Sequence, residues 1–304
     1  MSRETILVIR LGALGDIVMA AQAFQDIRRH HADAHIVLLT RRPFAGFART
    51  MPWFDDVMVD PYPRWSPMKW LKLRRMLRAL APDRVYDLQA KARTQRYANL
   101  LPAHPRPFWS RPVKDATALH VRDIWARQLR AAGVAASEAV DWDWCQASLN
   151  EFPLPQDYVV LIPGCSAHLT RKRWPSRCYA ALARRLFEGR GWTSVLVGTN
   201  ADQEAVQGII KLIPSALDIC GRTSLAQLAE LARGARAVIG NDTGPAHLAA
   251  AIGAPSLLLL SGHTDPARSA PRGAGAAWLK REHLTALSVD EVEQAVRALT
   301  AEKA

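Results

Sequence analysis

Short, mostly apolar runs alternate with stretches of helical periodicity along the chain, and this alternation restricts the possible folds more than any other feature. The runs predict strands at residues 6–9, 36–39, 57–59, 85–88, 158–162, 194–197, 218–220, 237–239 and 256–260. The stretches between them predict helices at residues 16–30, 67–80, 116–132, 176–188, 202–212, 224–233 and 288–299, and one more near Pro245. Strands that alternate with helices form parallel sheets with helices on both faces. We therefore predict an α/β protein.

Pro153 and Pro155 interrupt the alternation near mid-chain, and it restarts at residue 158. A chain of 304 residues is long enough for two domains, each with its own core. We expect a doubly wound domain at residues 1–152 and a second at 153–287, with a cleft between them. The helix at 288–304 is expected to pack back on the first domain.

Composition limits where the chain works and what it binds. No apolar run reaches the roughly 20 residues that span a bilayer, and no signal-peptide core follows Met1. The cysteines are scattered, without a C-x-x-C pair, which favours reduced thiols and argues against a structural zinc site. We expect a cytoplasmic protein. The formal net charge of +12 indicates an anionic partner: a phosphorylated substrate, an acidic membrane or nucleic acid.

Much of the positive charge lies between Arg64 and Lys114. Within this stretch, the predicted helix at 67–80 mixes cations with apolar residues. The cations are Lys69, Lys72, Arg74, Arg75 and Arg78, and the apolar residues are Trp70, Leu71, Leu73, Met76 and Leu77. A helix of this kind can lie on an acidic bilayer. The alternative is a helix packed by its apolar side and solvated by its cations.

The turn after the predicted strand at 237–239 is suited to an anion. The backbone N–H groups of Thr243 and Gly244 stand at the N-terminus of a helix, where the helix dipole attracts negative charge. Asp242 and His247 add polar side chains. We expect a phosphate-bearing ligand here. The alternative is an ordinary turn in which an Asp or Thr caps the helix.

Two further glycine loops follow predicted strands, at the carboxyl ends where open α/β sheets bind ligands. The first contains Gly12, Gly15 and Asp16 but no G-x-G-x-x-G, which weakens a nicotinamide interpretation. Its glycines allow close approach of the backbone, and Asp16 is a candidate general base or only a helix cap. The second loop, residues 163–175, combines a glycine turn, hydroxyls and cations that suit phosphate, unless it is a solvated basic loop.

Together these loops resemble glycosyltransferase family 9, the ADP-heptose:lipopolysaccharide heptosyltransferases. The resemblance rests on residues 12–16, on Lys172-Arg173-Trp174-Pro175 and on Asp242-Thr243-Gly244-Pro245-Ala246-His247. The segments Asp87-Leu88-Gln89 and Gly221-Arg222-Thr223-Ser224-Leu225 are similar to family segments as well. The resemblance implies a GT-B fold, in which two Rossmann-like domains face each other across a cleft. It places a nucleotide-sugar donor in the C-terminal domain and a lipid-linked acceptor against the N-terminal one.

The resemblance also implies roles for single residues. Asp16 matches the family's base and Lys172 its phosphate-binding lysine, and these are the expected catalytic residues. The expected donor-binding residues are Thr170, Glu204, Asp242, Thr243, Gly244 and His247, with Glu204 near the ribose. The expected acceptor-binding residues are Gly12, Gly15, Gln89 and Arg93. The family's D-L-Q-G segment ends in Ala90 here, which leaves the identity of the acceptor open.

The resulting prediction is an inverting, metal-independent glycosyltransferase without a cofactor. It moves heptose from ADP-heptose to a phosphorylated, lipid A-linked inner-core acceptor of lipopolysaccharide, at the anionic surface of the inner membrane. Asp16 takes the proton of the acceptor hydroxyl, while Lys172 and the helix end meet the charge on the leaving diphosphate. The same fold could use another nucleotide sugar or another acceptor.

Other classes of function remain as alternatives. Asp141-Trp142-Asp143 is a D-x-D triplet, which glycosyltransferases of another fold use to hold a metal beside the nucleotide. A nucleotide-dependent epimerase or dehydrogenase would need a G-x-G-x-x-G after a strand, and the sequence has none. A non-catalytic nucleotide- or nucleic-acid-binding protein would fit the charge, but the basic stretch has no recognisable nucleic-acid motif. We therefore expect no nucleic-acid partner.

Overall fold

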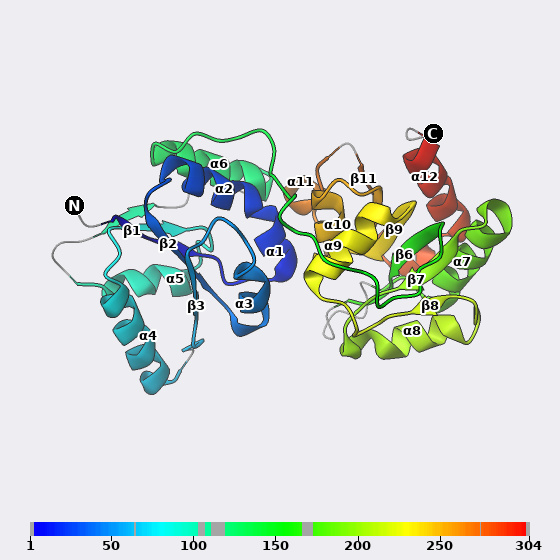
Figure 1. Cartoon of the computed structure of the whole chain (residues 1–304), viewed down its shortest axis with the longest axis horizontal. Coiled ribbons are helices and arrows are strands. Elements are labelled where there is room, and N and C mark those ends of the chain that lie inside the picture. Colours follow the sequence, from blue (N-terminus) through cyan, green and yellow to red (C-terminus); the bar gives the residue numbers. More distant parts are fainter. Residues whose placement is uncertain are drawn as a thin grey trace. The chain divides into compact units, whose positions relative to one another are not determined.

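The computed structural model describes residues 3–63, 65–102, 107–110, 119–165, 173–273 and 275–301. The chain forms two compact units, Met1–Trp144 and Cys145–Ala304 (Figure 1). Each unit contains one parallel sheet with helices, which confirms the predicted α/β class. The division falls at Trp144 rather than at the predicted residue 152. None of the helices in these ranges has the length and apolar character that a membrane span requires.

The first unit is built on a five-stranded sheet in the order β3-β2-β1-β4-β5. Its strands are β1 (Thr5–Ile9), β2 (His35–Thr40), β3 (Asp56–Val59), β4 (Arg84–Asp87) and β5 (Phe108–Ser110). Its helices are α1 (Leu14–Met19), α2 (Ala21–His30), α3 (Arg42–Ala48), α4 (Pro67–Leu80), α5 (Ala92–Gln95), η1 (Arg96–Leu100) and α6 (Val121–Ala131). The helices α4 and η1 share a core with Leu7 and Ile9 on one face, while α2 and α6 pack together on the other (Figure 1).

Some predicted elements of this unit differ from the observed ones. The predicted helix at 16–30 is two helices, separated by a turn at Ala20. The predicted helix at 116–132 begins at Val121, where the ring of His120 accepts a hydrogen bond from the Arg122 N–H (3.3 Å); residues 116–118 lie outside the described ranges. The short elements α3, α5 and β5 were not predicted, because an element of three to seven residues is too short to show a hydrophobic period.

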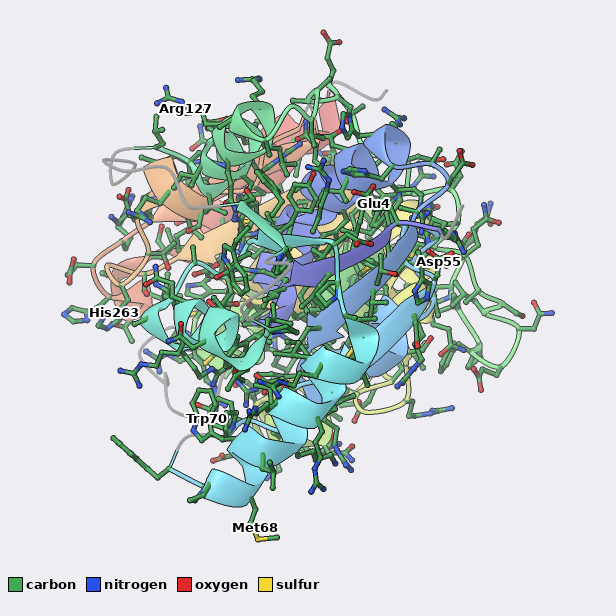
Figure 2. The ribbon with its side chains drawn as sticks, turned by 90° about the vertical axis from the view of Figure 1, so that its left-hand side faces the viewer. Glu4, Asp55, Met68, Trp70, Arg127 and His263 are labelled. Carbon is green, nitrogen blue, oxygen red and sulfur yellow. The ribbon has the colours of Figure 1, made fainter. Side chains whose placement is uncertain are left out.

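The helix α4 has the predicted bounds, and its apolar residues are divided between the core and the surface. Leu73 and Leu77 are fully buried and belong to the core of the first unit. The exposed large apolar side chains stand near its N-terminus instead: Trp65 is 94% exposed, Met68 82% and Leu71 45%. Figure 2 shows Met68 pointing away from the ribbon at the end of α4. The helix therefore packs with one face and presents an apolar tip with the other.

The second unit is built on a six-stranded sheet in the order β11-β10-β9-β6-β7-β8. Its strands are β6 (Tyr158–Ile162), β7 (Thr193–Leu196), β8 (Leu217–Asp218), β9 (Ala237–Asn241), β10 (Ser256–Leu260) and β11 (Ala276–Lys280). Its helices are α7 (Ser176–Arg190), η3 (Asn200–Asp202), α8 (Gln203–Ile210), α9 (Leu225–Gly234), α10 (Gly244–Ala251), α11 (Pro266–Ser269), η4 (Leu284–Ala286) and α12 (Val289–Ala301). The helices α7, α8 and α12 share a core on one face, and α9 and α10 pack together on the other (Figure 1).

The C-terminal helix α12 corrects one expectation. Residues 288–304 were expected on the first unit, but Val292 and Val296 are buried in the core of the second. There α12 contacts α7 and the strands β9, β10 and β11. Ser288 caps this helix, since its hydroxyl accepts from the Glu291 N–H at 3.3 Å. The periodicity identified a buried face but could not identify its partner.

Each sheet reverses its strand order once. In the first unit the chain builds outward from β1 through β2 to β3 and then returns to add β4 beside β1. In the second it builds from β6 through β7 to β8 and returns to add β9 beside β6. Doubly wound sheets bind ligands at the carboxyl ends of the strands where this reversal occurs. The loops after β1, β4, β6 and β9 are therefore the candidate ligand-binding loops.

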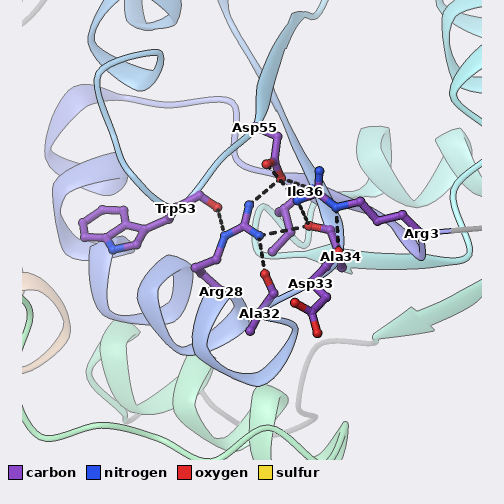
Figure 3. Close-up of polar contacts among 8 residues, drawn as sticks. All are labelled: Arg3, Arg28, Ala32, Asp33, Ala34, Ile36, Trp53 and Asp55. Carbon is purple, nitrogen blue, oxygen red and sulfur yellow. Dashed lines mark hydrogen bonds and ion pairs between the residues drawn. The ribbon is translucent and has the colours of Figure 1, made fainter.

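The opposite, amino-terminal edge of the first sheet is held by a polar network around Asp55 (Figure 3). The carboxylate of Asp55 accepts hydrogen bonds from the Ile36 N–H (2.8 Å), from Arg3 (3.0 Å) and from Arg28. Burial alone raises the pKa of Asp55, but the bonds from Ile36, Arg28 and Arg3 outweigh it and lower the pKa to about 2. Arg28 also donates to the Trp53 carbonyl (3.2 Å). The network ties the start of β2 to the start of β3.

We expect Asp55→Asn to lower the free energy of unfolding by about 2 kcal/mol, the usual scale for hydrogen bonds to a charged group. A carboxyl whose pKa is lowered on folding stabilises the protein above its ordinary pKa of 3.8, and this contribution disappears as the pH falls towards 2. The variant should therefore lose less stability than the wild type between pH 4 and pH 2. Urea unfolding at a series of pH values measures both effects, and parallel curves would contradict the assignment.

Candidate active site

The loop after β1 needs glycine at position 12 for two reasons. Gly12 has φ +109°, in the region that L side chains rarely adopt. A Cβ there would also lie 2.1 Å from the ring of Phe44. The space left by the missing side chain is thus filled by an aromatic ring of α3. Gly15 is buried in the first turn of α1.

Asp16 makes two polar contacts at the start of α1 and remains partly exposed. It lies in the first turn of α1, where its Oδ2 accepts from the Ala13 N–H (2.9 Å). Its Oδ1 pairs with Nη2 of Arg10 at 3.0 Å. The side chain of Asp16 remains 37% exposed. A carboxylate held in this way caps a helix and still presents an open edge to a ligand.

The loop after β4 is joined to the loop after β1. Gln89 accepts the Leu11 N–H on its Oε1 at 3.0 Å. Asp87, which is fully buried, accepts the N–H groups of Gln89 (3.1 Å) and Ala90 (2.9 Å) on Oδ1. Burial raises the pKa of Asp87. Ala90 has φ +51°, so the backbone keeps a left-handed turn at the position where the family segment has glycine.

Arg93 is held at the carboxyl end of β3. Its guanidinium pairs with the buried carboxylate of Asp60 (3.1 Å) and lies 4.3 Å from the ring centre of Tyr62. Arg41 lies over the same ring at 4.8 Å, and the Tyr97 hydroxyl donates to Asp60 at 3.0 Å. The structure therefore brings Gly12, Gly15, Asp16 and Gln89 to the strand reversal of the first unit. It sets Arg93 with a second cation beside β3.

Asn241, which the sequence analysis did not single out, is the central polar residue of the second unit. It is fully buried at the end of β9. Its Nδ2 donates to the carbonyls of Pro163 (2.8 Å) and Gly164 (3.2 Å). Its Oδ1 accepts from the Trp174 N–H (3.0 Å) and the Tyr179 hydroxyl (3.2 Å). One amide thus fixes the loop after β6 to the end of β9. The sequence signal that could have identified Asn241 is a polar amide at the end of an apolar strand.

Asp242 and His247 interact with each other. The Nε2 of His247 lies 3.0 Å from Oδ1 of Asp242, and the hydroxyl of Thr264 donates to Oδ2 at 2.5 Å. Both side chains are largely buried. This pair joins the end of β9 to the first turn of α10 and to the loop after β10.

Thr243 and Gly244 form the N-terminus of α10. Thr243 is the N-cap residue, but its hydroxyl makes no capping bond; Oγ1 is buried and has no hydrogen-bond partner in the described ranges. Gly244 is the first helical residue, with Pro245 directly after it as predicted. The first N–H groups of a helix have no partner within that helix. A buried hydroxyl and these N–H groups are therefore present together at the strand reversal of the second unit.

Two expected site residues, Thr170 and Lys172, lie outside the described ranges. The described residues beside them are firmly held. The indole of Trp174 is buried, and its Nε1 donates to the Leu287 carbonyl at 2.9 Å. Arg173 donates to the sulfur of Cys165 at 3.3 Å. All the cysteines, Cys145, Cys165, Cys178 and Cys220, are free thiols, as predicted.

In the loop after β7 the buried carboxylate is not Glu204. Glu204 is exposed in the first turn of α8. Asp202 is buried and accepts from the N–H (2.9 Å) and hydroxyl (2.8 Å) of Thr199. A Cβ at Gly164 would lie 2.2 Å from this carboxylate, so glycine there makes room for Asp202. Sequence reasoning missed Asp202 because two nearby acids at the end of one strand cannot be told apart without their orientations.

The D-x-D triplet forms a capped turn. Oδ1 of Asp141 accepts the Asp143 N–H at 2.8 Å. The rings of Trp142 and Trp144 stack at 5.6 Å and pack edge-on against Trp53. Within the described residues, no group of His, Cys, Asp and Glu side chains has the arrangement of a metal site. The triplet anchors the end of the first unit.

Two doubly wound α/β units with ligand loops at their strand reversals are the architecture of the GT-B class. A solved family 9 glycosyltransferase from Veillonella parvula has the same fold, with a TM-score of 0.81 and 20% identity over 98% of this chain and 97% of that one. Escherichia coli ADP-heptose lipopolysaccharide heptosyltransferase II gives a TM-score of 0.77 at 20% identity, over 98% of this chain and 99% of that one.

The sequence profile of glycosyltransferase family 9 (heptosyltransferase) matches residues 89–295, and the chain belongs to this family. Lipopolysaccharide heptosyltransferase 1 of Pseudomonas aeruginosa is 27% identical over 287 residues, which cover 86% of this chain and 79% of that protein. The protein is therefore a glycosyltransferase, and the predicted family and fold class are confirmed.

We expect Asn241→Ala to lower the free energy of unfolding by at least about 2 kcal/mol, because it leaves buried carbonyl and N–H groups unpaired. The same change should weaken ADP binding, since the loop after β6 loses its attachment to β9. Urea unfolding and calorimetric titration of ADP measure these effects. Asn150→Ala, at an exposed asparagine, is the control and should alter neither. Wild-type stability of Asn241→Ala would contradict the role of this amide.

Proposed function

We propose that this glycosyltransferase moves heptose, with inversion, from ADP-heptose to an inner-core, lipid A-linked acceptor of lipopolysaccharide. The proposal draws on the relatives from P. aeruginosa and E. coli, which are named as lipopolysaccharide heptosyltransferases, the second for ADP-heptose. The observation that supports it most is the N-terminus of α10, joined by Asn241 to the loop after β6. A phosphate-bearing donor suits this arrangement of N–H groups and helix dipole.

Asp16 acts as the general base. The acceptor hydroxyl is a weak nucleophile, and its proton passes to the exposed edge of the Asp16 carboxylate as the oxygen attacks the anomeric carbon. The sugar passes through an oxocarbenium-like state, as in other glycosyl chemistry. The Arg10 ion pair and the Ala13 N–H hold the carboxylate in one orientation.

The second unit receives the leaving diphosphate. The N–H groups of Thr243 and Gly244 and the dipole of α10 stabilise the developing charge. Lys172, assigned by family resemblance, adds a cation at the end of the loop after β6. Asp242 and His247 fix the first turn of α10 through their mutual bond. These groups take the role that a metal ion has in other glycosyltransferases, so no metal or cofactor is required.

The first unit receives the acceptor. Gly12, Gly15 and Gln89 shape the backbone around Asp16, as the hydrogen bond from Leu11 to Gln89 indicates. Arg93, with Arg41 across the Tyr62 ring, supplies cations for the acceptor's anionic groups.

A lipid-linked acceptor requires work at a membrane surface, and α4 is suited to it. The apolar tip of α4, defined as Trp65, Met68 and Leu71, belongs to a helix that also carries exposed cations. These are Lys69, Lys72, Arg74, Arg75 and Arg78. Cations near an anionic bilayer contribute about 1 kcal/mol each, and exposed apolar side chains can enter its interface. The enzyme is thus peripheral on the cytoplasmic side of the inner membrane.

We expect Asp16→Asn to reduce heptosyl transfer by about 10²- to 10⁴-fold, the usual range for loss of a general base. ADP affinity should stay within a few-fold of the wild type, since the donor binds the second unit. Product formation from ADP-heptose is measured with excess chelator and with added Mg²⁺, and both should give equal rates. Asp143→Asn is the matched control and should retain activity. Near-normal turnover of Asp16→Asn would leave that residue as a helix cap only.

For the membrane contact, we expect Trp65→Ser/Met68→Ser and Lys72→Glu/Arg75→Glu each to reduce co-sedimentation with vesicles containing phosphatidylglycerol. Both variants should raise the KM for a lipid-linked acceptor and leave ADP affinity unchanged. Added salt should weaken binding of the wild type as well. Phe187→Ser and Arg184→Glu/Lys211→Glu, at exposed positions of the second unit, are the matched controls. Equal binding to anionic and neutral vesicles, together with an unchanged acceptor KM, would remove the membrane role of α4.

A further inference from the structure

Arg10 is a buried cation directly behind the proposed base. It follows β1, and its side chain is 7% exposed. Nη2 pairs with Oδ1 of Asp16 at 3.0 Å, and Nη1 donates to the Leu88 carbonyl at 2.8 Å. The sequence drew no attention to Arg10, because a lone arginine after an apolar strand has many possible uses.

The helix α6 fixes this guanidinium from a distant part of the sequence. The guanidinium carbon of Arg10 lies 4.8 Å from the ring centre of Trp125. Nε1 of the same indole donates to the Leu88 carbonyl at 3.0 Å, so Trp125 and Arg10 share one acceptor. An arginine over an indole face is attracted by the ring, and more strongly where water is excluded. Ring, carbonyl and carboxylate therefore hold the guanidinium on three sides.

The charges around Arg10 make Asp16 its principal partner. Burial lowers the pKa of Arg10, while Asp16 and the buried Asp87 raise it. The Nε of Arg10 is buried and has no hydrogen-bond partner in the described ranges. An unpaired buried donor is costly. The position of the guanidinium is thus better explained by its contact with Asp16 than by its own hydrogen-bonding needs.

We propose that Arg10 is a positioning residue for Asp16, and that Trp125 holds Arg10 in place; this rests on the proposed function of Asp16 as the base. Arg10 forms an ion pair with Oδ1 of Asp16, and the Ala13 N–H donates a hydrogen bond to Oδ2. These two contacts hold the Asp16 carboxylate in one rotamer, with its exposed edge outward. During transfer the proton of the acceptor hydroxyl moves to Asp16, and Arg10 remains protonated. The proton then leaves Asp16 for solvent, which restores the ionised base.

The test compares Arg10→Gln, Arg10→Lys and Trp125→Phe with the control Arg28→Gln. Arg28 is a largely buried arginine paired with Asp55 at the opposite edge of the same sheet (Figure 3). The measurements are kcat, the KM for donor and acceptor, and Tm. We expect Arg10→Gln to lower kcat about 10- to 100-fold, less than loss of the base itself. Both KM values should change less than about threefold, since the Arg10 side chain is almost fully buried and leaves little surface for a substrate.

The split between kcat and KM separates positioning from folding. Arg10→Lys keeps the charge and should restore part of the rate. Trp125→Phe keeps a ring but loses the Leu88 bond, and should lower kcat less than Arg10→Gln. Arg28→Gln should lower Tm without changing kcat.

Coupling to Asp16 gives the decisive comparison. If Arg10 acts through Asp16, adding Arg10→Gln to Asp16→Asn should leave the residual rate unchanged within about threefold. A kcat for Arg10→Gln within about threefold of the wild type, or full additivity of the two changes, would overturn the positioning role while Asp16 remained the base. An active Asp16→Asn would instead remove the proposed function of Asp16. If Arg10→Gln does not fold, the same comparisons with Arg10→Lys and Trp125→Phe decide the question.

Discussion

The reversal of strand order in each sheet is the constraint on which the rest of the structure depends. At a reversal the two neighbouring connections leave in opposite directions, so the ends of the two central strands are not covered by the same crossover. Polar groups can gather there without disturbing the core. In the first unit the uncovered ends carry Arg10 and Gln89, and in the second they carry Asn241. Each of these side chains joins two loops that are far apart in sequence.

Much of the fold could be predicted from sequence, because a buried parallel strand is an uninterrupted apolar run. The strands at 158–162 and 256–260 were found with their observed bounds, and the helix at 67–80 matched α4. The helix α5 was not predicted and the strand β8 was predicted a residue too late, since two to four residues are too short to show a hydrophobic period. The partner of α12 could not be predicted, because an apolar face shows that a helix is buried but not which sheet covers it.

The candidate site was predictable only as far as single loops. The turn at 242–247 was identified from its strand, glycine and helix signals, and the structure brings its polar residues together. The contacts between loops were invisible, because hydrogen bonds such as those of Asn241 depend on strand order. Asp202 was missed because Glu204 lies close to it in sequence, and Arg10 because a lone arginine after a strand has many possible uses. In α4, periodicity predicted the helix but not which leucines face the core, so the burial of Leu73 and Leu77 could not be predicted.

Ala90 shows what a family motif specifies. The residue holds φ +51° although it has a Cβ, a conformation that costs an L residue roughly 1–2 kcal/mol. The N–H of Ala90 still reaches the Asp87 carboxylate, so the turn beside Gln89 survives the replacement. The last position of the D-L-Q-G segment therefore requires a positive φ angle rather than a particular residue type. Asparagine or aspartate would meet that requirement at similar or lower strain, whereas valine or isoleucine would not. Relatives that differ at this letter can retain the same loop, and comparisons of backbone dihedrals will recognise them where comparisons of letters do not.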